Sequence, residues 1–584
     1  MKRALALILA LVMTMALVAC GGDKPTSSTP SNPTTSTPST TNPSTPGTDK
    51  PAEPADPDAD KYGGDLIYGT SNAWTSFDPH QQSQSSLGNK YAIMHYTEGM
   101  SVKDINGKIY PQVCELEESA DGLTIKFTLR ERYFSNGEKV TIEDVDASIR
   151  RAAALANEST FKKYWEGSTY KVEGNTIVIT SEQYNINLLS GLVGDGTSYK
   201  ILPKAICDKY AFTGGTQHAS GLVTGATAPD LNVVEDAIGT GPYKLSKFVD
   251  EEFVLVRNEK YVSIPNEDAV GVAKEAKCYL DSISFQLNKD ASSRTAAMLT
   301  GEYDISSIQN EMRETALAQG LKFRSAGTTW THGIFFNLDA SNTDSPVYNV
   351  NIRKAIRAII DVDAVMLTIC SGNKDLIDYP LVPTPVVKES TAYHNTMLAD
   401  SGEWNVKDKA KAEAYVKAAN YDGTPIVYLT NATTTGAFYK TAMVVIPAME
   451  SIGLKVELMA VDAGSHSALR KDPKTGHDIG CWEVQKNTEN PVLHSTFVTG
   501  TQGWWSHPVK DETIAIMKTT PTGSPESVAA YEKYTQLVID ECPYILFGNP
   551  TGSEWTQGNV EKNTTGQINY YLWNAYFTEN PRKR

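Results

Sequence analysis

The chain has 584 residues, of which 53 are basic and 69 acidic, giving a net charge of −16. This acidic balance, without any block of like charge, argues against a nucleic-acid-binding protein, because a phosphate-binding surface needs a basic patch. The length exceeds what one hydrophobic core accommodates and predicts roughly two to four structural units.

The N-terminus has the pattern of a secretory signal. Lys2 and Arg3 precede an apolar run over residues 4–18 that is shorter than the ~20 residues of a membrane-spanning helix. Cys20 follows directly after small residues, an arrangement that resembles the lipobox of bacterial lipoproteins. The resemblance implies that the signal, residues 1–19, is removed and that Cys20 carries acyl chains such as palmitate. The alternative is an ordinary signal with a coincidental cysteine.

Residues 20–60 form the next unit. From Gly21 to Asp60 there is no Val, Ile, Leu, Met, Phe, Trp or Tyr, and Ser, Thr and Pro predominate. A segment with nothing apolar to bury cannot offset the entropy of ordering, so we expect a disordered, lipidated spacer. An anchor with a long spacer is typical of the outer face of a Gram-positive cell membrane. In a Gram-negative cell, the periplasmic side is the expected location.

Six cysteines remain once Cys20 is assigned to the anchor. They are widely separated and contain no C-x-x-C motif, so the sequence leaves open whether they pair as disulfides or stay as buried free thiols. These cysteines are Cys114, Cys207, Cys278, Cys370, Cys481 and Cys542.

From residue 61 onward, strand and helix patterns interleave, which predicts an α/β or mixed α+β fold. Residues 124–130 alternate polar and apolar side chains as a half-buried strand does. Residues 170–179 have the pattern of a hairpin. A helix is expected to begin after Thr141, because threonine is a good N-cap residue.

Two later helices are also expected. An amphipathic helix is predicted through residues 352–360, capped by Asn351 and stopped by Gly372. Another is predicted over residues 528–539, ending before a proline.

Several segments together resemble the extracellular solute-binding protein family 5, the oligopeptide, dipeptide and nickel-type receptors of ABC importers. The similarity follows the family order and covers essentially everything from residue 61 onward. The segments are residues 63–66 with 74–80, 119–145, 239–243 with 256–261, 301–305, and Asn337 with 350–355.

The resemblance implies a two-lobed clamp of the large periplasmic-binding-protein type, with an extended first lobe. Lobe I is expected over residues 61–325 and 546–584, and lobe II over residues 326–545. Short connectors near residues 323–327 and 543–549 suit a hinge. Ligand is then expected between the lobes, because clefts at domain interfaces commonly bind small molecules.

Aromatic side chains lead the candidates for ligand contact. The resemblance places Trp330, Trp482, Trp504 and Trp505 near the cleft, with core packing as the alternative for each. Neighbours on a loop do not easily both point inward, so we expect one of Trp504 and Trp505 to face the cleft or solvent. The full candidate set is Trp74, Thr240, Trp330, His332, Trp482, Glu483, Gln485, Trp504 and Trp505.

One segment departs from the family pattern. Peptide receptors of the family often carry G-W-x-A-D, in which the aspartate pairs with the α-amino group of the ligand. Here Gln485 stands at the aspartate position, and a neutral amide suits a sugar hydroxyl or a peptide carbonyl as readily as an ammonium group. Glu483 is nearby but offset from the aspartate position. If this segment is a strand, its side chain is expected on the opposite side from that of Trp482. If this loop is aligned to the family motif with a shift, Glu483 or Glu489 supplies the negative charge instead.

The sequence carries no G-x-S-x-G or H-E-x-x-H motif, and its nine histidines lack metal-ligand spacing. We therefore expect no catalytic residue, no metal site and no cofactor.

The resemblance implies a monomeric, surface-anchored receptor that captures a small solute, most simply a short peptide, and delivers it to the permease subunits of an ABC importer. Nucleic acid is not an expected partner, and the membrane is contacted only through the lipid. A sugar or a metal chelate remains an alternative ligand. A surface-tethered hydrolase and a peptide sensor that does not transport remain alternative functions.

Overall fold

The computed structural model describes residues 58–81, 86–104, 108–193, 199–326, 330–378, 392–434, 436–485, 492, 504–562 and 571–582. The predicted signal, the lipidation site at Cys20, nearly all of the spacer and Glu489 lie outside the described residues. Within them, no helix combines the length and the apolar character that crossing a membrane requires.

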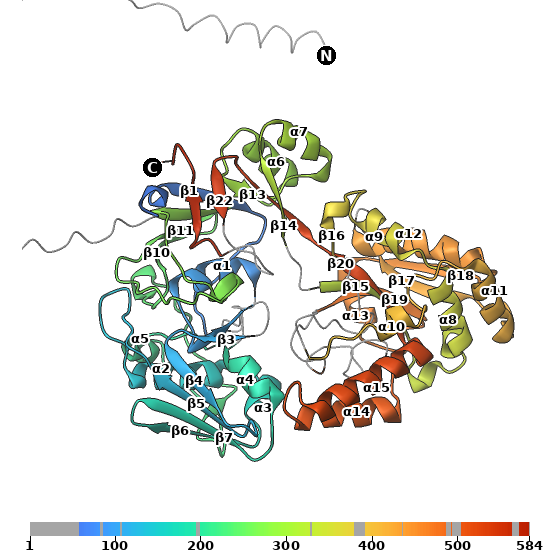
Figure 1. Ribbon diagram of the computed structural model, residues 1–584, viewed down its shortest axis with the longest axis horizontal. Coiled ribbons are helices and arrows are strands. Elements are labelled where there is room, and N and C mark those ends of the chain that lie inside the picture. The colour runs from blue at the N-terminus through green and yellow to red at the C-terminus, as the bar shows by residue number, and fades with distance from the viewer. Residues whose placement is uncertain are drawn as a thin grey trace, which may run out of the picture. The chain divides into compact units, whose positions relative to one another are not determined.

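A seven-stranded sheet organises the first lobe (Figure 1). Its strands lie in the order β10 (Tyr243–Phe248), β11 (Glu252–Arg257), β12 (Ser282–Leu287), β1 (Asp65–Thr70), β13 (Ile305–Ser306), β21 (Gly552–Thr556) and β14 (Lys322–Ala326). β1 is parallel to β12 and β13, whereas β21 is antiparallel to β13 and β14. The sheet therefore combines the early part of the chain with a strand that returns from near its C-terminal end.

A four-stranded antiparallel sheet extends the first lobe and confirms the local predictions made there. Its strands lie in the order β4 (Cys114–Glu118), β5 (Thr124–Leu129), β7 (Thr176–Ser181) and β6 (Ser168–Glu173). The predicted strand is β5 and the predicted hairpin is β6–β7. Thr141 caps α2 (Ile142–Leu155) as predicted, because its side chain accepts from the Asp144 N–H while Asp144 accepts from the Thr141 N–H.

A six-stranded sheet organises the second lobe. Its strands lie in the order β16 (Ile377–Asp378), β20 (Tyr544–Pro550), β15 (Trp330–Phe336), β19 (Ile479–Gln485), β17 (Ile426–Asn431) and β18 (Val456–Val461). Helices α8 (Val350–Ile359), α9 (Val362–Ile369), α11 (Lys409–Ala418) and α12 (Ala437–Glu450) gather around it, as do α14 (Pro508–Thr519) and α15 (Pro525–Glu541) (Figure 1). With strands and helices interleaved in this way, the fold is mixed α/β, as predicted.

The other helices and short strands connect these layers. The helices are α1 (Leu87–Tyr96), α3 (Glu158–Trp165), α4 (Ile186–Val193), α5 (Lys204–Lys209), α6 (Ala291–Leu299), α7 (Arg313–Ala318), α10 (Met397–Asp400) and α13 (Ala463–Leu469). The strands are β2 (Ser101–Lys103), β3 (Ile109–Pro111), β8 (Thr216–Gln217), β9 (Val223–Thr224), β22 (Val560–Lys562) and β23 (Ala575–Phe577).

The amphipathic helix predicted over residues 352–360 is real, but its predicted ends are wrong. Its cap is Asn349, whose side chain accepts from the Asn351 N–H, and α8 ends at Ile359. Asp361 then caps a second helix, α9, and Gly372 follows that helix instead. A second good N-cap residue after one extended residue therefore splits the apolar pattern into two helices. The helix predicted over residues 528–539 is confirmed as the middle of α15.

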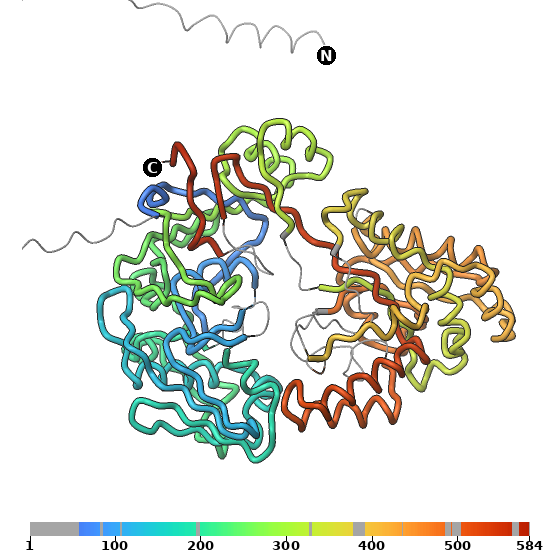
Figure 2. The backbone as a smooth tube through the Cα atoms, viewed as in Figure 1, coloured from blue at the N-terminus to red at the C-terminus, as the bar shows by residue number. Residues whose placement is uncertain are grey.

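The chain passes between the two lobes at two neighbouring places. β14 ends in the first sheet and β15 begins in the second, while β20 and β21 make the return (Figure 2). Ser325 Oγ donates to Thr551 Oγ1 over 3.0 Å and links the two connections. The lobe limits at 325/326 and 545/546 stay a prediction. β20, which belongs to the second sheet, extends past the second limit to Pro550.

All six cysteines that the structure describes are buried free thiols, which resolves the alternative that the sequence left open. Burial raises the pKa of Cys114 to about 12 and that of Cys207 to about 11, so neither is a reactive thiolate at neutral pH.

Thiol titration without reductant tests this assignment. In a Cys20→Ser variant, which removes the predicted lipidation site, we expect almost no rapid reaction in the native protein, because the six described sulfurs are shielded. After denaturation we expect all six to react. Fewer than six thiols in the denatured protein would contradict the assignment and indicate a disulfide.

Candidate functional site

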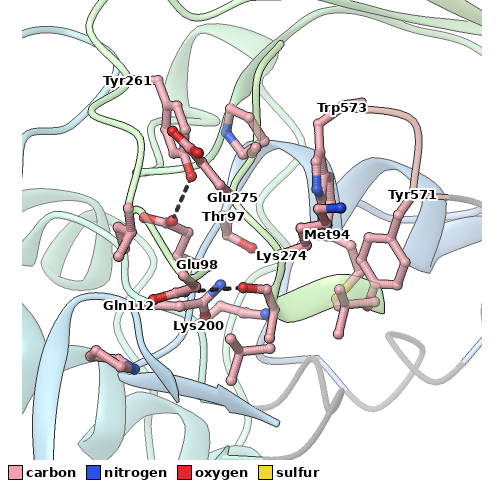
Figure 3. Close-up of a pocket in the computed structure, with 18 residues that line it drawn as sticks. Met94, Thr97, Glu98, Gln112, Lys200, Tyr261, Lys274, Glu275, Tyr571 and Trp573 are labelled. Atoms are coloured by element: carbon pink, nitrogen blue, oxygen red, sulfur yellow. Dashed lines mark hydrogen bonds between the residues drawn. The ribbon is translucent and has the colours of Figure 1, made fainter. Parts of the chain in front are cut away.

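A pocket in the first lobe encloses about 520 Å³ of space, part of which is open to solvent (Figure 3). The end of α1, the residue before β10, the segment before β12 and the returning C-terminal segment contribute to its walls. Its polar and aromatic lining includes Thr97, Glu98, Gln112, Lys200, Tyr261 and Trp573. Charges of both signs therefore lie beside aromatic rings in one hollow.

Glu98, which follows α1, is buried in this wall but already has partners. The Arg132 guanidinium donates to one carboxylate oxygen of Glu98, and the Tyr261 hydroxyl donates to the other over 3.3 Å. Burial lowers the pKa of Arg132, but Glu98 and Tyr261 together raise it more, so the net direction is upward and the guanidinium stays charged. The negative charge of Glu98 is thus neutralised from within the protein.

The opposite wall comes from the C-terminal return and is held from two sides. The Leu572 N–H donates to His95 Nε2 over 3.2 Å, while His95 Nδ1 donates to the Tyr91 carbonyl over 2.7 Å. Burial lowers the pKa of His95 to about 4, so the ring is neutral at physiological pH and makes both bonds as one tautomer. On the other side, the Cys278 N–H donates to the Trp573 carbonyl over 2.7 Å.

In the second lobe, strands β15 and β19 bring together five of the predicted site residues. Their antiparallel register pairs Trp330 with Gln485, His332 with Glu483, and Gly333 with Trp482. Two of these side chains reach the surface, because Trp330 is 47 % exposed and the Glu483 side chain 33 %. Two segments that lie far apart in the sequence thus form one candidate ligand-contact strip at the start of β15.

His332 lies beneath this strip and is fully buried. Its Nε2 lies 2.7 Å from Thr441 Oγ1 and 3.4 Å from Cys481 Sγ, and its Nδ1 lies 3.7 Å from a Glu483 carboxylate oxygen. Burial lowers the pKa of His332, but Cys481 and Glu483 together raise it more, to about 9. At neutral pH, a positively charged imidazolium therefore lies beside Glu483.

Trp482 lies on the opposite face of β19 from Glu483, as the strand alternation predicts. Its ring stacks on Phe335 at 4.7 Å and is 1 % exposed. The ring also covers Gly480, where a Cβ atom would lie 1.8 Å from it, so the glycine is needed for this packing. In the structure Trp482 is a core residue.

The expectation that one of Trp504 and Trp505 faces a cleft or solvent is wrong, because each is only 7 % exposed. Trp504 has a left-handed backbone with φ of 49°, which turns the chain between the two rings. The Trp504 ring then packs near the His477 ring, with 5.8 Å between ring centroids. The Trp505 ring packs near Tyr534, with 6.1 Å between centroids. Neighbouring side chains can both point inward when the backbone between them bends in this way.

The two remaining candidates belong to the first lobe and are also buried. The Trp74 indole N–H donates to the Val249 carbonyl over 2.7 Å, and its ring meets Phe253 edge-on at 4.8 Å. Thr240 is fully buried between two glycines that pack against the end of α1. Trp74 therefore packs in the core, whereas the motif around Thr240 supplies Pro242 to the pocket wall.

A family model describes residues 108–515 of this chain, under the name bacterial extracellular solute-binding proteins, family 5. That is more than half of the sequence. The chain belongs to this family. The membership confirms the resemblance inferred from the sequence motifs.

Sequence relatives and solved structures are similar to this chain over most of its length. The family 5 chain is 24 % identical over 520 residues to the glutathione-binding protein GsiB of Salmonella typhi, covering 86 % of this chain and 91 % of GsiB. It matches the ABC transporter substrate-binding protein CtaP of Listeria monocytogenes with a TM-score of 0.71 at 17 % identity, covering 89 % and 100 % of the two chains. It matches DppA of Helicobacter pylori, solved with the peptide STSA, with a TM-score of 0.62 at 18 % identity, covering 89 % and 99 %. The neighbours are two-lobed periplasmic binding proteins, which confirms the predicted fold class.

Sequence reasoning missed most of the pocket in this family 5 chain. Pro242 and Tyr261 lie in segments that carried the family resemblance, so that resemblance pointed to one wall. Glu98, Lys200 and Trp573 lie in no recognised motif.

The ionisation of His332 is directly testable by NMR titration of labelled histidines. We expect His332 to titrate near pH 9, and the Glu483→Gln variant to titrate lower, because the carboxylate favours the charged ring. Since the folded pKa lies above the ordinary 6.5, this stabilisation is complete below pH 6.5 and is lost as the pH rises through 9.

Glu457→Gln is the matched control, because Glu457 is an exposed carboxylate on the outer strand β18. It should leave the His332 titration unchanged. A His332 titration at or below pH 6.5 in the unsubstituted protein would contradict the assignment.

Proposed function

We propose that this chain is the receptor of an ABC importer, capturing short peptides outside the cell and delivering them to a membrane permease. Family 5 membership supports a solute-binding role. A peptide ligand is supported by relatives named for binding glutathione and by a structural neighbour solved with the peptide STSA.

The observation that carries the peptide assignment is the first-lobe pocket. It places lysine and glutamate side chains beside aromatic and aliphatic ones around one hollow. A short peptide has the same mixture, with charged ends, polar backbone groups and apolar side chains.

The mechanism we propose is binding with lobe closure, in which no covalent bond changes. Ligand favours the closed arrangement only as far as it makes more contacts there than in the open one. The two adjacent connections, β14 to β15 and β20 to β21, suit a hinge because few residues need to change their backbone angles.

We further propose that the receptor is held at the outer face of the membrane by acyl chains on Cys20. The support is the sequence pattern of residues 1–20, followed by an apolar-free spacer that reaches the folded part. Each buried acyl methylene contributes ~0.8 kcal/mol, so two or more chains give stable attachment.

Ligand binding is tested by mass spectrometry of compounds released from the purified protein, followed by calorimetry with those compounds. We expect short peptides that bind stoichiometrically and are recovered intact. A ligand at ~100 times its Kd should raise the free energy of unfolding by about 2.7 kcal/mol. Hydrolysed peptides would indicate a tethered hydrolase instead. Binding without uptake in cells would indicate a sensor.

The anchor is tested by replacing Cys20 with alanine and following the protein through membrane fractionation and palmitate labelling. We expect the variant to lose the label and leave the membrane fraction, because the acylated side chain is absent. Ser27→Ala, in the same segment, should keep both. An unlabelled, membrane-free protein before any substitution would rule out the anchor.

A further inference from the structure

One hydrogen-bond donor in the pocket wall has no acceptor. Trp573 lines the pocket and is only 6 % exposed, and its indole N–H is itself buried. No acceptor among the described residues lies within hydrogen-bonding distance of it. Leaving a buried donor unpaired costs free energy, so an acceptor from outside the protein would be favoured at this point.

The surrounding contacts keep this donor in place. The Trp573 ring packs edge-on against the rings of Tyr571 and His95, with 4.4 Å and 5.6 Å between ring centroids. The next residue, Asn574, accepts from the Lys277 N–H over 2.7 Å and donates to the Glu275 carbonyl over 2.8 Å. Together with the Leu572–His95 hydrogen bond, these contacts fix the segment, so the N–H is preorganised for an incoming acceptor.

We infer that the Trp573 N–H binds a carboxylate oxygen, and that the pocket takes the C-terminal carboxylate end of a peptide. This inference rests on the proposed function and names the end of the ligand that the pocket recognises. Trp573 offers a donor only, which suits a carboxylate and cannot pair with an ammonium group.

The charges around the pocket favour the same end of the ligand. Glu98 is neutralised by Arg132, and Glu275 accepts from Ser263 over 2.9 Å and forms an ion pair with Lys277 over 3.1 Å. Both carboxylates of the lining are therefore paired with cations from behind the wall. The exposed ammonium of Lys274 also lies in the lining and adds positive charge (Figure 3).

The rest of the lining suits the side chain of the last peptide residue. Met94, Ile264 and Val272 give apolar surface, and the pocket is partly open, so the peptide can continue outward. The inferred ligand group is thus an apolar residue that ends in a carboxylate.

Calorimetry with matched ligands tests the inference on the whole protein. One peptide that binds is prepared as the free acid, as the C-terminal amide and as the N-acetylated acid. We expect the amide to bind roughly tenfold more weakly and the acetylated acid to bind like the parent. An N-acetylated single amino acid tests whether a free carboxylic acid suffices as ligand.

The Trp573→Phe variant removes the donor and keeps an aromatic ring. We expect its affinity for the free acid to fall by roughly tenfold and its preference for acid over amide to shrink towards none. Trp165→Phe is the control, because Trp165 is a buried tryptophan of the four-stranded-sheet region whose N–H already donates to Tyr199 over 2.8 Å. The control should keep the acid preference.

The outcomes separate the two proposals. If peptides bind equally well as acid and amide, or if acetylation is what weakens binding, the carboxylate inference is wrong while the receptor function stands. If no peptide binds in any form, the proposed function itself fails. Should Trp573→Phe not fold, the acid and amide comparison on the unsubstituted protein decides alone.

Discussion

The pairing of β21 with β13 and β14 is the interaction on which the first lobe and its pocket depend. It returns the C-terminal part of the chain to a sheet whose other strands lie before residue 327. Buried charge then secures the return, because Lys562 forms an ion pair with Glu554 over 3.0 Å where both side chains are almost inaccessible. Removing one partner of such a pair typically costs ~3–5 kcal/mol, because the other charge stays buried and uncompensated. Without this return, the wall that carries Trp573 would not reach α1.

Local signals predicted the elements that local chemistry determines. The capping box at Thr141, the hairpin β6–β7 and the middle of α15 all follow from residues close in sequence. The errors arose where a second, equally good signal lay nearby. Asn349 and Asp361 each cap a helix, so the single apolar pattern became α8 and α9. Likewise, nothing in the sequence indicated the left-handed conformation of Trp504 that buries both neighbouring rings.

The candidate site could be predicted only as far as motifs reach. Family motifs identified the segments that became β15 and β19, but not the register that places His332 opposite Glu483. The pocket depends on contacts between distant residues, such as the hydrogen bond from Leu572 to His95, 477 positions apart. Neither residue carries a recognisable pattern alone. Burial and charge at such a contact emerge only when the chain is folded.

Two buried histidines, one in each lobe, are held in opposite charge states. His95 is held neutral by burial, with a pKa of about 4, and serves to position the pocket wall. His332 is held charged, with a pKa of about 9, and lies next to a partly exposed carboxylate. His95 therefore acts through its hydrogen bonds, whereas His332 places a localised charge beside Glu483.

The indole N–H groups of Trp482 and Trp573 both lack an acceptor among the described residues, but Trp482 stacks in the core whereas Trp573 lines the pocket. A buried donor without an acceptor typically costs ~1–3 kcal/mol of stability, a substantial share of the ~5–15 kcal/mol that stabilises a domain. Phenylalanine would fill much of the same space without that cost. Departures from local optimality of this kind are expected at functional sites, where the missing partner arrives with the ligand. Stability given up in the empty pocket would then be recovered as affinity when a carboxylate occupies it.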